Sequence, residues 1–163
     1  MPRTLRPFLL LFLLLMQEAQ AQSVDQWTAW GDAALERNDR YGASRFYSEA
    51  LALEPGRMEL QWKYAEACRL SNQYDKAAEM YEKVQRKDLD RTHPTALRWL
   101  AEMQMCTAQY DDAQRSWEKL RKREAGKSSF EALRAESGLL GCRFAKDALR
   151  APDKTVTIEH LAE

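Results

Sequence analysis

An internal repeat constrains the fold of this chain more than any other feature of its sequence. Three segments each contain a small residue, an aromatic residue four positions later and an apolar residue seven positions later. These sets are Ala43/Tyr47/Ala50, Ala77/Tyr81/Val84 and Ala113/Trp117/Leu120, and their alanines are 34 and 36 residues apart. The spacing i, i+4, i+7 places all three side chains on one stripe of an amphipathic helix. A period of this length indicates a unit that buries its apolar face by stacking on its neighbours.

A second helix is expected in front of each of these segments. Twelve residues before the three alanines stand the small residues Gly31, Ala65 and Ala101, which follow the bulky residues Trp30, Tyr64 and Leu100. Each period is therefore predicted to hold two helices joined by a short polar turn, such as residues 38–40 or 71–73. Six glycines and five prolines are few for the turns of a many-stranded domain, so the fold is predicted to be all-α.

This pattern resembles the tetratricopeptide repeat (TPR), in which small residues let paired helices approach and aromatic residues fill the gaps between successive pairs. The residues that match its structural signature are Trp27, Trp30, Gly31, Ala43, Tyr47, Ala50, Pro55, Ala65, Ala77, Tyr81, Ala101, Ala113 and Trp117. The resemblance implies a right-handed superhelix of three helix hairpins, over residues 24–57, 58–91 and 94–127, within a domain that spans 22–150. The second copy departs from the signature with Leu89 where a proline is expected, and two extra residues precede the third.

A capping helix over residues 128–150 is expected to close the last hairpin, because a terminal repeat otherwise exposes its packing face. The segment Ser128-Ser129-Phe130-Glu131 has the spacing of a capping box with Ser128 as the N-cap. The expected apolar face consists of Phe130, Leu133, Leu140, Phe144 and Ala148. Residues 151–163 are interpreted as a linker and the start of a following β domain, since Val156 and Ile158 alternate with polar residues.

The first 21 residues have the features of a cleaved secretory signal peptide. Arg3 and Arg6 precede nine apolar residues, Phe8 to Met16, and Ala19 and Ala21 provide the small residues of a cleavage site. Nine helical residues cover about half of a ~30 Å hydrocarbon core, so no membrane insertion is expected after cleavage. No cysteine directly follows the apolar run at the expected cleavage site, which argues against a lipoprotein. We therefore predict an exported protein, periplasmic or associated with a bacterial outer membrane.

Charge and composition argue against several other classes of function. The formal net charge is zero, whereas a nucleic-acid binder usually carries a basic excess. The basic run 119–123 is interpreted as a solvated helix end, with a basic patch as the alternative. Cys68, Cys106 and Cys142 are expected to be small core residues, with a single disulfide as the alternative. The sequence shows no metal, phosphate-binding or catalytic motif, so neither an enzyme nor a cofactor is predicted.

A narrower resemblance concerns three segments, Gly31–Ala34, Ala65–Leu70 and Cys142–Ala145. They are similar to the N-terminal TPR module of Bacteroidetes-type OmpA-family envelope proteins, in which a signal peptide and a TPR domain precede a β-propeller and an OmpA-like domain. This resemblance implies that the chain is the first part of a longer envelope protein.

The TPR resemblance also implies a concave groove lined by the first helix of each hairpin, which would bind a protein or peptide. The groove candidates are Thr28, Asp32, Leu35, Trp62, Glu66, Arg69, Arg98, Glu102 and Met105. Trp62 stands out because Tyr64 and Ala65 already occupy the packing positions of its helix; the alternative is that it packs under a neighbouring element. The predicted function is an exported protein–protein interaction scaffold of the cell envelope, whose partners are other envelope proteins or downstream domains of the same chain. The alternative is a rigid spacer module of a larger OmpA-like, peptidoglycan-associated outer-membrane protein.

Overall fold

The computed structural model describes residues 23–89 and 91–151, and the regular structure in this part of the chain is entirely α-helical. The expected signal peptide and the expected strand at Val156 and Ile158 lie outside the described residues. The helices are α2 (Val24–Glu36), α3 (Arg40–Leu53), α4 (Met58–Leu70), α5 (Tyr74–Asp88), α6 (Ala96–Cys106), α7 (Tyr110–Arg123) and α8 (Phe130–Arg150).

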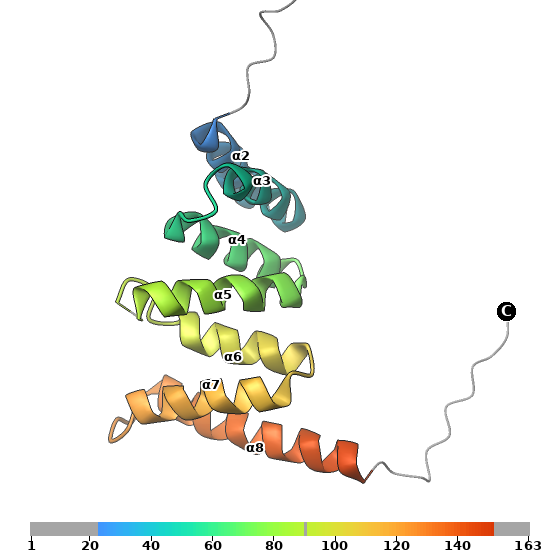
Figure 1. Cartoon of the computed structure of the whole chain (residues 1–163), viewed down its shortest axis with the longest axis vertical. Helices are drawn as coiled ribbons and strands as arrows, with labels where there is room; N and C mark the ends of the chain where they lie inside the picture. The colour runs from blue at the N-terminus through green and yellow to red at the C-terminus, as the bar shows by residue number, and fades with distance from the viewer. Residues whose placement is uncertain (1–22, 90, 152–163) are drawn as a thin grey trace, which may run out of the picture.

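The helices form a single stack in which each one packs against the next (Figure 1). Helices α2 and α3, α4 and α5, and α6 and α7 make three successive hairpins. Helix α8 closes the far end of the stack, where it packs on α7 and also touches α6. The predicted all-α fold of three helix hairpins plus a closing helix is confirmed.

The core is divided among the junctions of the stack, and each junction is centred on one aromatic side chain. Tyr47, Tyr81 and Trp117 are at most 1% exposed. Tyr81 packs against Ala65 of its own hairpin and against Leu100 of the next, and the other two aromatic residues are placed in the same way. These rings therefore hold neighbouring hairpins together, as the repeat pattern predicts.

Two glycines allow close contacts between neighbouring helices. A Cβ atom at Gly31 would overlap the ring of Tyr47, and one at Gly138 would overlap the indole of Trp117. Gly138 lies in α8, so the same device serves within the first hairpin and between the third hairpin and the closing helix. Its role in α8 has no counterpart among the signature residues identified in the sequence.

The turn inside each hairpin has the same backbone conformation. Asn38, Asn72 and Ala108 adopt the left-handed conformation, with φ of 61°, 61° and 58°. The residue after each one donates its backbone N–H to a carbonyl five residues earlier, for example Gln73 to Cys68 at 2.8 Å. This arrangement ends the first helix and satisfies carbonyls that would otherwise lack partners.

The connection before α6 is held by a buried carboxylate. Asp88 is 4% exposed and accepts backbone N–H groups from Thr92 and His93 at distances of 2.7 to 3.0 Å. Burial alone would raise the pKa of Asp88, but these hydrogen bonds outweigh it and lower the pKa below its ordinary value. This capping contact fixes the irregular junction where two extra residues enter the repeat.

The structure corrects two expectations about α8. The N-cap is Ser129 rather than Ser128: the Ser129 hydroxyl accepts the N–H of Ala132 at 3.1 Å, and Glu131 pairs with Arg98 instead of completing a capping box. The face expected to pack, with Phe130, Leu133, Leu140, Phe144 and Ala148, is exposed. The packed face consists of Ala135, Gly138, Leu139 and Cys142, because small side chains let the helix approach the bulky indole of Trp117.

The cysteines follow the expectation only in part. All three lie in the described part of the chain and are free; Cys68 and Cys142 are buried, whereas Cys106 is exposed. Burial raises the pKa of the Cys68 thiol to about 11. Cys106 is thus not a core residue: it ends α6 beside the turn to α7, away from the packed stripe.

Across the described residues, no helix has the length and apolarity needed to cross a membrane.

Candidate interaction surfaces

Helices α2, α4, α6 and α8 form one continuous surface, which we call the inner face. It carries the nine predicted groove residues on α2, α4 and α6. The nine residues stand three positions before, one after and four after Gly31, Ala65 or Ala101, so their side chains lie on the stripe next to the one that packs on the second helix of each hairpin. The contacts of the nine show what this face can offer to a ligand.

In the first repeat, Asp32 joins two hairpins. Its carboxylate accepts the hydroxyl of Tyr47 at 2.6 Å and the ammonium of Lys63 at 2.7 Å. Burial would raise the pKa of Asp32, but the hydrogen bonds from Lys63 and Tyr47 outweigh it and lower the pKa. Burial and the contact with Asp32 raise the pKa of Tyr47 well above its ordinary range. Asp32 is therefore charged and paired at neutral pH.

The second repeat carries the same carboxylate–tyrosine contact with an added arginine. Glu66 accepts a short hydrogen bond from the Tyr81 hydroxyl and binds the Arg69 guanidinium at 2.7 Å. Arg69 also donates to the Tyr81 hydroxyl at 3.1 Å. The pKa of Tyr81 is raised by burial and by the neighbouring Glu66. These three groups form a closed network at the centre of the inner face.

One aromatic residue of this face, Trp99, was not among the predicted groove residues. The Trp99 indole lies between two guanidinium groups, with the Cζ atoms of Arg69 and Arg98 at 3.9 and 3.8 Å from its ring centroid. Such cation–π contacts connect α4 to α6. The sequence contained evidence for this placement. Leu100 and Ala101 already occupy the packing positions of α6, and the same argument was used to place Trp62 on the groove.

The third repeat is tied to α8 by four alternating charges. Arg98 binds Glu102 at 3.3 Å and Glu131 at 3.0 Å, and Arg134 binds Glu102 at 3.0 Å. The side chains of Arg98 and Glu102 are 12% and 17% exposed, so these pairs are partly shielded from water. Sequence reasoning identified Arg98 and Glu102 but not their partners on α8, which lie about 30 residues away in the chain.

Trp62 has a packing role in the structure. Its ring stacks on the His93 imidazole with centroids 4.2 Å apart and meets the Tyr81 ring edge-on at 5.6 Å. It is half-buried and covers the middle core cluster. Of the two alternatives drawn from the sequence, packing under a neighbouring element describes these contacts. Trp99, rather than Trp62, is the tryptophan held between cations on the inner face.

The three remaining candidates also have intramolecular contacts. The Thr28 hydroxyl donates to the Val24 carbonyl at 2.7 Å, Leu35 packs against the first core cluster, and Met105 packs against the cluster beneath α8. Each of the nine candidates thus has a partner within the chain. The inner face is a paired, nearly neutral surface and not a field of one charge.

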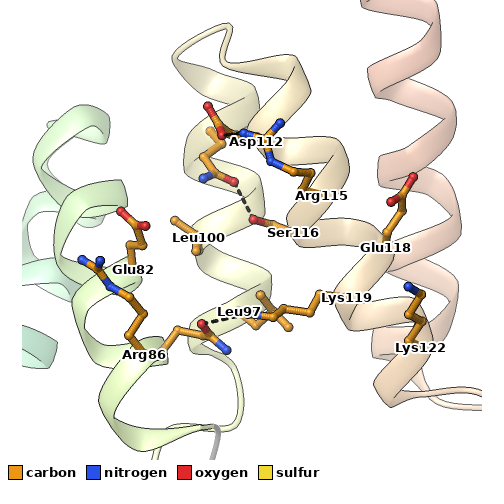
Figure 2. Close-up of a pocket in the computed structure, with 12 residues that line it drawn as sticks. Glu82, Arg86, Leu97, Leu100, Asp112, Arg115, Ser116, Glu118, Lys119 and Lys122 are labelled. Carbon is orange, nitrogen blue, oxygen red and sulfur yellow. Dashed lines mark hydrogen bonds and ion pairs between the residues drawn. The ribbon is translucent and has the colours of Figure 1, made fainter.

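A hollow lies on the opposite side of the stack, between the second helices α5 and α7 (Figure 2). Its volume is about 500 Å³; Leu97 and Leu100 of α6 form its floor, and charged side chains of both signs form its rim. Lys119 spans it to reach the Gln85 amide oxygen at 3.3 Å. The equivalent hollow between α3 and α5 has only about 110 Å³. The larger one lies where two extra residues separate the repeats, and sequence reasoning did not anticipate it.

The basic run 119–123 lies in the last turns of α7, where cations complement the helix dipole. Lys119 reaches Gln85, and Arg121 lies 4.0 Å from Glu136 of α8. Its position at a helix end accounts for this basic run.

Within residues 23–89 and 91–151, no group of three His, Cys, Asp or Glu side chains is arranged to hold a metal ion.

Comparison with solved structures agrees with this geometry. The TPR domain of Sgt2 from Aspergillus fumigatus superimposes with a TM-score of 0.55 at 22% identity, covering 86% of this chain and 89% of that one. The fold is a TPR superhelix. At this identity the likeness concerns the fold alone, and the three hairpins described above are TPR hairpins.

A second solved structure comes from Bacteroides ovatus and carries a provisional description as a protein-binding protein. It is 21% identical, with a TM-score of 0.36, and the match covers 82% of this chain and 92% of that chain. No family model and no curated protein matches the sequence.

Proposed function

We propose that this TPR module is an exported scaffold of the bacterial cell envelope that binds a protein or peptide segment on its inner face. The observation that carries the proposal is the row Arg69, Trp99 and Arg98, contributed by two successive repeats. Tryptophan and arginine are the side chains most often found at the energetic centre of protein interfaces. A rigid TPR stack presents them without an ordering cost on binding.

The charges of the inner face suggest the chemistry of the partner. Its acidic groups Asp32, Glu66, Glu102 and Glu131 each pair with a basic group of the same face. A strongly charged peptide would gain little long-range attraction and would have to displace existing pairs. The fitting partner is a largely uncharged segment with apolar or aromatic side chains that packs against the half-buried Trp99 and the two guanidinium groups beside it. Its affinity should change little with salt concentration.

Site-specific photo-crosslinking in the native host tests this binding face. A photoreactive amino acid at Thr28 on the inner face should capture a discrete protein, whereas one at Glu49 or Glu82 on the second helices should not. Trp99→Ala should reduce that capture about 10-fold or more, as expected for a hot-spot residue. Trp30→Ala is the matched control, since Trp30 is 40% exposed and packs on Trp27 and Phe46, away from this row. Equal capture by the Trp99 variant and the wild type would contradict the proposal.

Export is supported by the sequence of residues 1–21 and needs its own test. Cell fractionation of the tagged chain should place it outside the cytoplasm, shortened by about 2.5 kDa relative to the translated product, as for a cleaved signal peptide. Replacing Ala19 and Ala21 with bulky residues should leave the longer form. Recovery of the full-length chain in the cytoplasm would reject the envelope location.

A second candidate function is a rigid spacer in a longer OmpA-like protein. One observation favours it: every predicted groove side chain already has a partner inside the chain, as a purely structural surface requires. The two candidates differ in the crosslinking outcome, since a spacer gives no intermolecular product from Thr28. Reading the gene downstream of Glu163 for propeller and OmpA-like sequences tests the OmpA context separately.

A further inference from the structure

The last helix carries a row of large apolar side chains that are largely exposed to solvent. Phe130, Leu133, Leu140 and Phe144 are between 59% and 78% exposed. They lie on α8, the helix at the open end of the stack (Figure 1), and none of them belongs to its packed set of Ala135, Gly138, Leu139 and Cys142. Isolated exposed apolar residues are ordinary, but a contiguous row on one helix marks an interaction surface.

The spacing of the row specifies what can cover it. Phe130, Leu133, Ser137, Leu140 and Phe144 are separated by 3, 4, 3 and 4 residues, which is the alternation of a coiled-coil seam. Such a seam is narrow and fits one further helix lying nearly along it. The opposite side of α8, with Ala135, Gly138 and Cys142, is already packed on the third hairpin, so the helix has one free side.

Charges beside the seam favour one orientation of that helix. Glu136 and Arg143 flank the row on the same side, one heptad apart. When two copies of α8 pair antiparallel with Leu133 packed on the partner's Phe144, Glu136 lies opposite the partner's Arg143, and two-fold symmetry repeats both contacts. A parallel pair would place Glu136 opposite the partner's Gly141 and would gain no ion pair. The ion pair of Glu136 with Arg121 is exposed and 4.0 Å long, so it is weak. The Glu136 carboxylate can therefore pair with the partner's Arg143 instead.

We propose that the seam of α8 is a homodimer interface, in which the α8 helices of two copies pack antiparallel at the ends of their stacks. The dimer would be a continuous array of two TPR modules with both inner faces left accessible. This inference does not rest on what the inner face binds; the two surfaces adjoin at Phe130, whose ring centroid lies 5.8 Å from the Cζ atom of Arg98.

Analytical ultracentrifugation of the purified chain tests the dimer, in reducing buffer so that the exposed Cys106 cannot crosslink two copies. The wild type should be dimeric at about 50 µM, a concentration at which a micromolar interface is filled. Leu140→Glu should be monomeric with unchanged helicity. Leu53→Glu is the matched control: Leu53 is 52% exposed on α3, at the other end of the stack, and its variant should remain dimeric.

A charge swap tests the register. Glu136→Arg and Arg143→Glu should each raise the dimer Kd about 10-fold or more, because each places like charges opposite one another twice. The double variant should return to within about 3-fold of the wild type, since the pairs are restored in reverse. Glu49→Arg on α3 serves as the charge control and should leave the Kd unchanged.

Three results would overturn the proposal. One is a wild type that stays monomeric up to about 100 µM, as it would if residues 152–163 or another protein covered the seam. Another is dimerisation that survives Leu140→Glu. The third is a double charge variant weaker than either single one, which would exclude the antiparallel register.

Discussion

At the scale of single residues, the smallest side chains determine how closely the helices pack. Gly31 and Gly138 lie against the rings of Tyr47 and Trp117, where a methyl group has no room. The helix interior is otherwise a poor place for glycine, since alanine is more stable there by about 1 kcal/mol. The close approach of a buried aromatic ring outweighs this propensity at both positions.

Gly31→Ala should therefore destabilise the protein even though alanine is the better helix former. The overlap with Tyr47, which is fully buried, forces the ring or the helix to shift, and overpacking of this kind costs about 1–3 kcal/mol. Urea unfolding followed by circular dichroism would show a lower midpoint. Gly56→Ala, at a site with open space, should leave the midpoint unchanged or raise it slightly. Equal midpoints for the two variants would show that the Tyr47 contact is not tight.

At the scale of elements, the first helix of each hairpin ends at a residue in the left-handed conformation. In the third repeat this residue is Ala108, which is less suited to positive φ than the asparagines of the first two repeats. Asn38 and Asn72 suit positive φ because their short polar side chains tolerate this region, whereas alanine pays a steric cost. The repeat thus keeps its backbone geometry at Ala108 because the hairpin packing on either side determines it, and the local sequence does not.

Ala108→Asn should consequently stabilise the third hairpin by about 0.5–1 kcal/mol, through relief of strain at φ 58°. Ala108→Gly should act in the same direction, because glycine has no Cβ to clash. Thermal unfolding would report both as a rise in Tm of a few degrees. Ala52→Gly, in exposed helical backbone of α3, is the opposing control and should lower the Tm. A fall in Tm for both Ala108 variants would contradict the strain argument.

At the scale of the whole molecule, stability is distributed along one dimension. Each hairpin contacts only its neighbours, so the ends of the stack lack support on one side. The middle cluster around Tyr81 draws on α4, α5 and α6 and receives the cover of Trp62 and Trp99. On the inner face, an ion pair connects α2 to α4, the contact of Arg69 with Trp99 connects α4 to α6, and ion pairs connect α6 to α8. These contacts help to fix the twist between hairpins.

Native-state hydrogen exchange should follow this arrangement. Amides in the middle of α5 should exchange about 10-fold or more slowly than those of α2 and α8, because the terminal helices can open without the rest. The measurement is best made on the Leu140→Glu variant, in which no second copy protects α8. Uniform protection across all seven described helices would instead indicate that the stack unfolds as one cooperative unit.

Most of the fold was accessible from the sequence, because the information is local. The repeat of Ala43, Ala77 and Ala113 with their following aromatic residues located all three hairpins, and the helical period alone determines which residues share a stripe. The site was accessible only in part. The register identified Arg98 and Glu102 on the inner face, but their partners Glu131 and Arg134 come from a helix whose docking angle no local pattern encodes.

The sequence by itself determined the helices, their pairing and the aromatic residues that separate the hairpins, since these follow from apolar periodicity and side-chain size. Only the tertiary structure decided which side of α8 is buried. Its larger apolar residues predicted that one face would be buried. The opposite face packs instead, because the small residues Ala135, Gly138 and Cys142 let the helix approach the Trp117 indole closely. The sequence of a helix with two possible packing faces does not determine which face is buried. That depends on the shape of the neighbouring surface, which is formed by residues far away in the chain.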